Sequence, residues 1–378
     1  MPHHSSVLAS LQTQLQPGQA LFLSIPADIQ YFTGFVFLSP EEREAFLLVT
    51  SVECVFFYAA FSPLPEDLPK SVKVVEGTNL KNVESVLTTF FQEHQVRELL
   101  LDYSDVVINE LEMLKHLAET TRIGLNKLDR EQIWRMRLIK QPNELVFMRQ
   151  AGQIAIESFT KVSKSLKVGQ TEKQVAVELE HQMRLLGADL AAFPTIVAFG
   201  TNGTLPHHQP DGTVLKKETA VLIDMGARVN GYRSDLTRSF WFGSKPSADF
   251  TTVSEIVTAA YQAGLDLASQ IGSKNAAGQS TKASQIDQAT RHLITEAGYG
   301  PQFIHTTGHG VGLDIHEPPS LNWANSQELL PGMVITIEPG IYLKNLFGYR
   351  YENTVVLTAS GTEVLTLDSD KLAKKSSN

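Results

Sequence analysis

The chain has 378 residues, more than one hydrophobic core usually supports, so we expect two domains. Its 42% hydrophobic and 19% charged residues are typical of a folded globular protein rather than a disordered one. The formal net charge of −9 repels polyphosphate, and the only basic cluster is the tail at 371–378, which we interpret as a solvated end. The composition therefore argues against a protein that binds nucleic acid.

Cys54 is the single cysteine, so an intramolecular disulfide is impossible, and its apolar neighbours favour a buried thiol. No run of about 18 apolar residues occurs, and the N-terminus lacks the basic start and apolar stretch of a secretion signal. We therefore expect a cytoplasmic protein without a membrane span.

The N-terminal third, from about Leu21, alternates short apolar runs with helical patterns. Three apolar runs predict strands: AFLLVT, ECVFFYA and VRELLLD. Helices are expected at about Leu80–His94 and Ser104–Thr120. This alternation is typical of a small α/β domain.

The pattern changes near Asp129, where a charged segment (LDREQIWRMRLIKQPNE) leads into a long amphipathic helix. We expect that helix at about Glu144–Leu166. The change places a domain boundary near Asp129, with an N-terminal domain at 1–128 and a second domain at 129–378.

The C-terminal part combines helices with strands. Thr171 and Gln174 form a capping-box pattern, which predicts a helix that ends at Gly187. Further helices are expected at about Thr251–Ile271 and Ser284–Ala297. Four strand-like runs separate and follow them: TIVAF, AVLIDMGARVNGYRSDLTRSFWF, MVITIEPGIYL and GYRYENTVVLT. This part is predicted to be α+β, with antiparallel hairpins that carry most of its acidic residues.

Two aspartates, Asp224 and Asp235, lie in apolar, strand-like segments joined by a Gly-Tyr turn. A carboxylate in an apolar region is costly unless it is paired or bound to a metal. Either aspartate alone could equally well cap a turn or pair with Arg233 or Arg238, so the pattern leaves both explanations open.

Three histidines, His305, His309 and His316, lie within twelve positions and are interspersed with glycines that let a ligand approach the backbone closely. One lone histidine is usually a core residue, but three in this context indicate a ligand-binding or catalytic site. Glu317, beside His316, could simply be exposed.

Two glutamates, Glu338 and Glu352, stand in strand-like runs where a buried, unpaired carboxylate would be rare. The chain thus offers four carboxylates and at least one imidazole to one polar centre. Such a ligand set suits Mn²⁺, with Co²⁺, Zn²⁺ or Fe²⁺ also possible. Because four carboxylates exceed the charge of one divalent ion, we expect two ions.

The set of ligands in this order and in these contexts resembles the M24 metallopeptidases, which include methionine aminopeptidase, aminopeptidase P and prolidase. The resemblance covers about 129–367, and the run PADIQYFTGF is similar to the opening motif of the N-terminal domain in the prolidase and aminopeptidase P branch. It implies a "pita-bread" fold for the C-terminal domain, two divalent metal ions, a homodimer, and hydrolysis of the Xaa-Pro bond in proline-containing peptides.

The resemblance also implies individual roles. The metal ligands would be Asp224, Asp235, His309, Glu338 and Glu352, with Asp235 and Glu352 bridging the two ions. Glu338 would in addition shuttle a proton. The other implied site residues are His207 and His316 on the substrate side, His305, and Arg350, which would steady the ligands.

Two positions fit the family pattern poorly. Asn353 stands where the family usually has Asp, which puts the tuning of the neighbouring ligand in doubt rather than metal binding itself. His208 has no expected role, and we interpret it as a surface residue.

Three alternatives to an aminopeptidase P-type enzyme remain at this point. The chain could be a prolidase that cleaves Xaa-Pro dipeptides, a non-catalytic interaction protein on the same fold, or a metal-free amidinohydrolase similar to creatinase. No basic residue follows His316 and Glu317 closely to bind a dipeptide carboxylate, so we favour Xaa-Pro-Xaa substrates. Arg350, or an arginine of a partner subunit, could reverse this preference.

Overall fold

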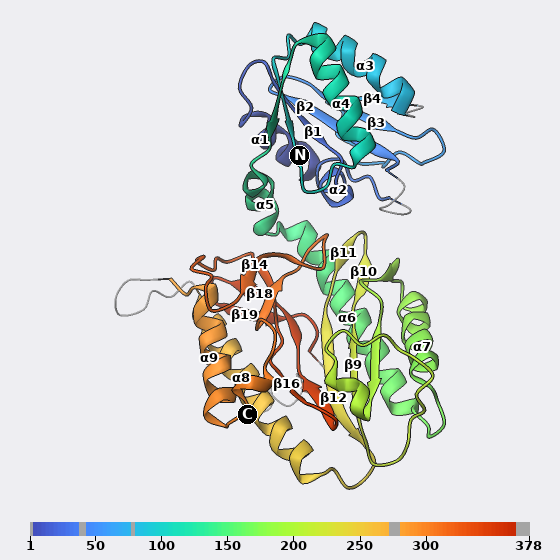
Figure 1. The fold of residues 1–378 in the computed structure, drawn as a ribbon, viewed down its shortest axis with the longest axis vertical. Coiled ribbons are helices and arrows are strands. Elements are labelled where there is room, and N and C mark those ends of the chain that lie inside the picture. Colours follow the sequence, from blue (N-terminus) through green and yellow to red (C-terminus); the bar gives the residue numbers. More distant parts are fainter. Residues whose placement is uncertain (1–2, 38–42, 77–79, 272–279, 368–378) are drawn as a thin grey trace. The chain divides into compact units, whose positions relative to one another are not determined.

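The computed structural model describes residues 3–37, 43–76, 80–271 and 280–367 (Figure 1). The basic tail at 371–378 lies outside them. The chain divides into two compact units, 1–137 and 138–378.

The division falls between Arg137 and Leu138, the last two residues of helix α5 (Arg130–Leu138), whereas the charge pattern placed it near Asp129, before that helix. The cause is a buried aspartate of the N-terminal unit. Asp28 is fully buried and accepts hydrogen bonds from both Arg130 and Arg137, the latter at 2.8 Å, so α5 is fastened to this unit.

The N-terminal unit is built on a six-stranded mixed sheet in the order β4-β3-β2-β1-β5-β6. Its predicted strands and helices are present as β2 (Ala45–Thr50), β3 (Cys54–Tyr58), β5 (Glu98–Leu101), α3 (Leu80–Glu93) and α4 (Ile108–Thr121). Cys54 is a buried free thiol, as expected. The unit also has α1 (His3–Gln12), β1 (Gln19–Leu23), α2 (Pro26–Thr33), β4 (Val72–Glu76) and β6 (Gly124–Lys127).

The C-terminal unit places strands between two pairs of helices, with α6 and α7 on one side and α8 and α9 on the other (Figure 1). The helices are α6 (Pro142–Ser165), α7 (Glu172–Leu185), α8 (Ala248–Ala268) and α9 (Ala283–Glu296). The capping box at α7 is confirmed, because Thr171 Oγ1 accepts from Gln174 N at 3.2 Å and Gln174 Oε1 accepts from Thr171 N at 2.9 Å. No described helix is long and apolar enough to cross a membrane.

Two antiparallel sheets of this unit carry the predicted site. One has the order β12-β9-β8 and the other β14-β13-β15-β18-β19. Their strands are β8 (Ile196–Phe199), β9 (Thr219–Met225), β12 (Leu236–Phe242), β13 (Gly308–Gly310), β14 (Glu317–Leu321), β15 (Val334–Ile337), β18 (Asn353–Thr358) and β19 (Gly361–Val364). Smaller sheets contain β7 (Leu190–Ala191), β10 (Ala227–Val229), β11 (Tyr232–Arg233), β16 (Gly340–Leu343) and β17 (Phe347–Arg350).

Strand register explains why distant acidic residues meet. In the first sheet Thr237 of β12 lies opposite Asp224 of β9, and Asp235 precedes β12. In the second sheet Ile337 of β15 pairs with Asn353 of β18. Glu338 and Glu352, the residues just beyond that pair, therefore leave the sheet at the same end.

Candidate metal centre and active site

A cavity of about 890 Å³ in the C-terminal unit is lined by every residue that the sequence placed in the site. Its acidic wall comes from the ends of β9, β12, β15 and β18, and its histidines come from the segments around β8, β13 and β14. The predicted residues on its wall are His207, Asp224, Asp235, His305, His309, His316, Glu338, Arg350 and Glu352.

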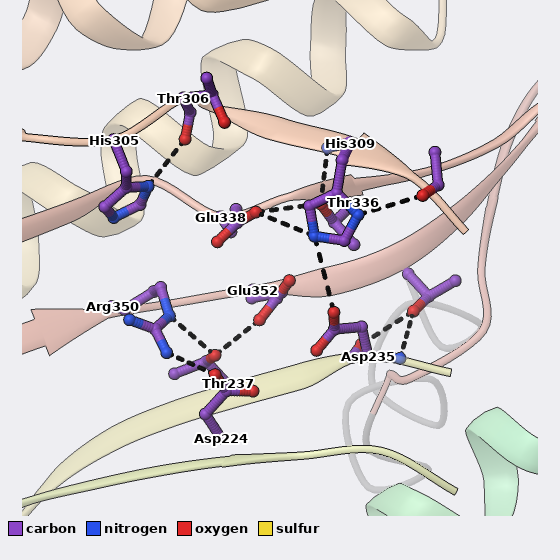
Figure 2. A network of polar contacts seen from close by, with 12 residues as sticks. Asp224, Asp235, Thr237, His305, Thr306, His309, Thr336, Glu338, Arg350 and Glu352 are labelled. Carbon is purple, nitrogen blue, oxygen red and sulfur yellow. Dashed lines mark hydrogen bonds and ion pairs between the residues drawn. The ribbon is translucent and has the colours of Figure 1, made fainter. Parts of the chain in front are cut away.

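Three of the predicted ligands converge most closely. Asp235, His309 and Glu352 each offer a ligand atom, and these atoms lie within 4.8 Å of one another. Glu338 joins them, because its Oε1 lies 3.3 Å from His309 Nε2, while Asp235 Oδ2 lies 3.7 Å from the same nitrogen (Figure 2). Oxygen and nitrogen donors gathered in this way form a ligand set typical of divalent cations.

His309 is oriented for ligation by its own backbone. Its Nδ1 lies 3.1 Å from the carbonyl oxygen of Gly310, which can only accept a hydrogen bond, so Nδ1 carries the proton. Nε2, which faces the carboxylates, is therefore left with its lone pair. Burial lowers the pKa of His309 and keeps the ring neutral, which is the form that binds a metal.

The carboxylates repel one another in the absence of a cation. Burial, followed by the charges of Glu352 and Asp224, raises the pKa of Asp235 well above its ordinary value. Burial and the charges of Glu338 and Asp224 do the same to the pKa of Glu352, and burial raises the pKa of Glu338. A positive charge in the cluster would offset this repulsion.

Asp224 is held by a buried arginine. Arg350 is only 3% exposed and its Nη2 donates to Asp224 Oδ2 at 2.5 Å. Its Nε donates at 3.0 Å to Thr237 Oγ1, and that hydroxyl donates at 2.6 Å to Glu352 Oε2. Although burial alone would lower the pKa of Arg350, Tyr342 and the nearby carboxylates raise it well above its ordinary value.

The chain of contacts continues from Arg350 to His305. Arg350 Nη1 donates to the Tyr342 hydroxyl at 2.6 Å, and that hydroxyl lies 2.9 Å from His305 Nε2. Burial raises the pKa of Tyr342 to about 12, so its O–H stays intact and donates to His305. Because His305 Nδ1 lies 2.7 Å from the Thr306 carbonyl oxygen, both ring nitrogens are occupied. His305 is thus part of the support of Asp224.

The second carboxylate oxygen of Asp224, Oδ1, also points to a cation site. Asp224 Oδ1 is buried without a hydrogen-bond partner among the described residues, which is costly for a carboxylate oxygen. With Asp224 included, the donor set holds four carboxylates and one neutral imidazole. Divalent metal ions bind carboxylate oxygens and imidazole nitrogens in proteins, so these residues fit such ions.

His207 and His316 line the same cavity but differ from the cluster in their surroundings. Both are exposed, and no side-chain hydrogen bond is formed by either ring within the described part of the chain. The ring of His316 lies edge-on to that of His309, with centroids 4.5 Å apart. Both imidazoles are therefore available to a ligand in the cavity.

Two interpretations of single residues were wrong. His208 is not a surface residue: it is 8% exposed, and its Nε2 lies 2.7 Å from Glu172 Oε2. Glu317 is not exposed: it is 5% exposed and pairs with Lys140 at 2.9 Å. In both cases the partner is more than 30 residues away in the sequence, so no local pattern reveals it.

The local arginines are not the partners of the aspartates. Arg233 donates to the carbonyl oxygens of Leu313 and Ala192, and Arg238 donates to backbone oxygens and to Asn353. No sequence pattern pointed to Tyr342 or Thr237, whose hydroxyls link Arg350 to His305 and Glu352. Such residues look like ordinary strand residues until the strands pair.

Asn353 itself lies away from the cluster of acids. Its Oδ1 accepts from Arg238 at 2.8 Å and its Nδ2 donates to the Tyr261 hydroxyl at 2.8 Å. Its side chain is fully buried. The amide therefore links the Arg238 guanidinium to the Tyr261 hydroxyl at the start of β18.

Comparison with known proteins agrees with this geometry. The chain is 32% identical over 373 residues to the Xaa-Pro dipeptidase of Lactobacillus delbrueckii subsp. lactis, covering 97% of this chain and 98% of the relative. It is 31% identical over 346 residues to the Xaa-Pro dipeptidase of Pyrococcus furiosus, covering 92% of each chain.

Solved structures show the same fold over nearly the whole length. The Xaa-Pro dipeptidase from Bacillus anthracis superposes with a TM-score of 0.83 at 27% identity, covering 97% of each chain. The X-Pro aminopeptidase from Thermotoga maritima superposes with a TM-score of 0.80 at 27% identity, covering 95% of this chain and 98% of that one. The expected α/β domain followed by a pita-bread domain is thus confirmed. The model of metallopeptidase family M24 matches residues 146–359, and the chain belongs to that family.

Proposed function

We propose that the protein is a metal-dependent peptidase that hydrolyses the bond between an N-terminal residue and a following proline. The observation that carries this proposal is the convergence of Asp235, His309 and Glu352 within 4.8 Å on the wall of an 890 Å³ cavity. The relatives named above are Xaa-Pro dipeptidases and an X-Pro aminopeptidase, and they support the choice of bond.

Two divalent ions would be held by Asp224, Asp235, His309, Glu338 and Glu352. When bound, the ions supply Lewis acidity and lower the pKa of water enough to provide hydroxide near neutral pH. Mn²⁺ is the most suitable ion because four of the five ligands are carboxylates, although Co²⁺, Zn²⁺ and Fe²⁺ accept the same donors.

The chain's own residues then divide the work. Arg350 fixes Asp224 through Oδ2, and this leaves Oδ1 available to hold a cation. Glu338 Oε2 forms no hydrogen bond within the described chain, so this oxygen can take up the proton of the attacking water and pass it to the proline nitrogen.

His207 and His316 complete the catalytic set from the open side of the cavity. Although the residue is exposed, partial burial of its ring against the cavity wall lowers the pKa of His316, so the ring is neutral near pH 7 and can donate one hydrogen bond while accepting another. We assign these two rings to the carbonyl oxygen that becomes negative during attack and to the departing nitrogen.

Substrate length is a finer part of the proposal. Among the described residues that line the cavity, Arg350 is the only arginine or lysine, and its contacts to Asp224, Thr237 and Tyr342 occupy its guanidinium. Gln327, also on the wall, carries a neutral amide without a side-chain hydrogen bond in the described structure. A neutral peptide group beyond the proline suits this wall better than a free carboxylate. We therefore favour Xaa-Pro-Xaa substrates, with a prolidase activity on Xaa-Pro dipeptides, the activity named for several relatives, as the alternative.

The test is hydrolysis of Ala-Pro, Ala-Pro-Ala and Met-Ala-Ala by stripped protein supplied with Mn²⁺, Co²⁺ or Zn²⁺. Cleavage of the proline peptides with the higher kcat/KM for Ala-Pro-Ala is expected. Gln327→Arg should shift the preference toward Ala-Pro, whereas Ser326→Arg, a neighbour outside the cavity wall, should not. A preference for Met-Ala-Ala would refute the proposed bond, and a clear preference of the unaltered protein for Ala-Pro would refute only the proposed length.

The reduced, buried thiol and the family resemblance also favour a cytoplasmic homodimer, which we include in the proposal. Sedimentation of the purified protein tests the dimer directly. A sedimentation mass near that of one chain at micromolar concentration would contradict it.

A further inference from the structure

The segment from Leu205 to Asp211 carries two adjacent histidines that face opposite surroundings. His207 is exposed and lines the cavity. His208 is 8% exposed and its Nε2 lies 2.7 Å from Glu172 Oε2. One ring is thus directed to the candidate active site and the other is anchored in the interior.

The anchor is the first residue of α7. Glu172 is fully buried, and its Oε2 accepts from His208 Nε2 and from the backbone N of Asp211 at 3.1 Å. Its Oε1 accepts from Phe199 N at 2.7 Å and from Asn202 Nδ2 at 2.9 Å. A single carboxylate therefore holds the end of β8, the 3-10 turn after it and the segment that carries His207.

Glu172, His208 and Asp211 could instead bind a metal ion, because one ligand atom of each lies within 4.8 Å of the others. The hydrogen bonds argue against that use. Four donors already occupy the two oxygens of Glu172, and Asp211 Oδ1 accepts from Thr213 N at 2.6 Å. With its acceptor sites engaged, the group is suited to anchoring the chain.

We infer that Glu172 and His208 are positioning residues that fix the His207 ring against the substrate. The inference rests on the proposed function, because it assigns His207 a place in catalysis. Its physical basis is that His207 lies in a turn closed by the hydrogen bond from His208 N to Leu205 O at 3.1 Å, so a fixed His208 holds the backbone that carries the His207 ring. Small displacements of a catalytic group have large effects, since a shift of about 1 Å can cost roughly 10²-fold in rate.

A double-mutant cycle on kcat/KM for Ala-Pro-Ala separates this role from general support of the fold. His208→Ala should lower kcat/KM by roughly 10-fold or more when His207 is present, and by less than about two-fold in the His207→Ala background. His208→Gln, whose amide can still donate to Glu172, should recover most of the loss. His181→Ala, an exposed histidine on the same helix as Glu172, is the matched control and should leave kcat/KM unchanged.

A second readout does not depend on activity. In Zn²⁺-loaded protein with ¹³C-labelled histidine, the His207 ring resonance can be assigned by its loss in His207→Ala. In His208→Gln it should stay near the wild-type position, and in His208→Ala it should move toward the value of a mobile histidine. This result is expected even if the Xaa-Pro activity itself proves absent.

Three results would overturn the inference. One is an equal loss of kcat/KM from His208→Ala in both backgrounds, which indicates a role in the fold alone. Another is an unmoved His207 resonance in His208→Ala. The last is fewer metal ions per chain in His208→Gln than in wild type, which would identify a metal site instead of an anchor.

Discussion

Lys140 Nζ lies 2.9 Å from Glu317 Oε2, and each of these side chains is only 2% exposed. Lys140 precedes α6, and Glu317 directly follows His316, so the ion pair joins the start of the C-terminal unit to the cavity wall. Glu317 Oε1 also accepts from Asp314 N at 3.1 Å. Glu317, the neighbour of His316, is therefore part of a buried polar connection.

Replacing only one partner of this ion pair should destabilise the fold more than replacing both charged residues with neutral ones. Lys140→Met removes the cation that pairs with the buried Glu317 carboxylate, and it should lower the free energy of unfolding by about 3–5 kcal/mol. The double variant Lys140→Met with Glu317→Gln retains an acceptor for Asp314 N and should recover most of that loss. Urea unfolding of the metal-loaded proteins measures both. A loss below about 1 kcal/mol in the single variant would show that the pair is not desolvated as described.

The carboxylates of the cluster should be essential for turnover. Glu338→Gln and Asp235→Asn each remove one negative charge from a centre that is proposed to hold two divalent ions. Both variants should fold, and both should lose nearly all hydrolysis of Ala-Pro-Ala. If either retains more than about a tenth of wild-type kcat/KM, a loss of less than ~1.4 kcal/mol in barrier terms, the two-metal assignment is wrong.

Histidines at the site should separate into a ligand and a proton-handling group. His316→Ala should lower kcat by roughly 10²–10⁴-fold, because its ring is proposed to act on the substrate. The metal content should stay near the wild-type level, because His316 is not one of the proposed metal ligands. His309→Ala should instead lose metal. Metal analysis after desalting, read beside kcat, distinguishes the two. Equal metal loss in both variants would contradict the division of roles.

In the stripped protein, the acidic cluster should make stability depend on pH. The raised pKa values of Asp235 and Glu352 mean that the folded state retains protons which the unfolded state loses above about pH 4, so stability falls as pH rises. Asp235→Asn removes one such group. Its Tm in the stripped form should exceed that of wild type by a margin that grows between pH 5 and pH 8. A constant margin over that range would mean that the pKa of Asp235 is not raised.

The acidic cluster could be predicted from sequence because its members interrupt apolar strands. Asp224 and Glu338 stand out in AVLIDMG and MVITIEPG, where a carboxylate has no local partner. The same signal was absent for Tyr342, which lies in an apolar strand as aromatic residues commonly do. Its importance depends on the hydrogen bonds of its hydroxyl to Arg350 and His305, which exist only after β16 and β17 have paired.

Contacts between distant segments account for the other omissions. Lys140 and Glu317 are separated by 177 positions, and His208 and Glu172 by 36, so neither pair leaves a periodic pattern. In the N-terminal unit, helix α1 was not expected because HHSSVLASLQ offers only a short apolar stripe; Leu8 and Leu11 are its buried residues. Strand β4 is mostly exposed, with only Val72 buried, and so lacked the alternation that identified its neighbours.

The most direct test of the proposed dinuclear centre is a titration of fully stripped protein with Mn²⁺, followed by the initial rate of Ala-Pro-Ala hydrolysis. The five proposed ligands predict no activity without metal and a rate that reaches its plateau when two ions are bound per chain. Full activity in the stripped protein would point to metal-free chemistry of the amidinohydrolase kind. Absence of activity at every Mn²⁺ concentration, with the protein folded and two ions bound, would contradict a peptidase and favour a binding module.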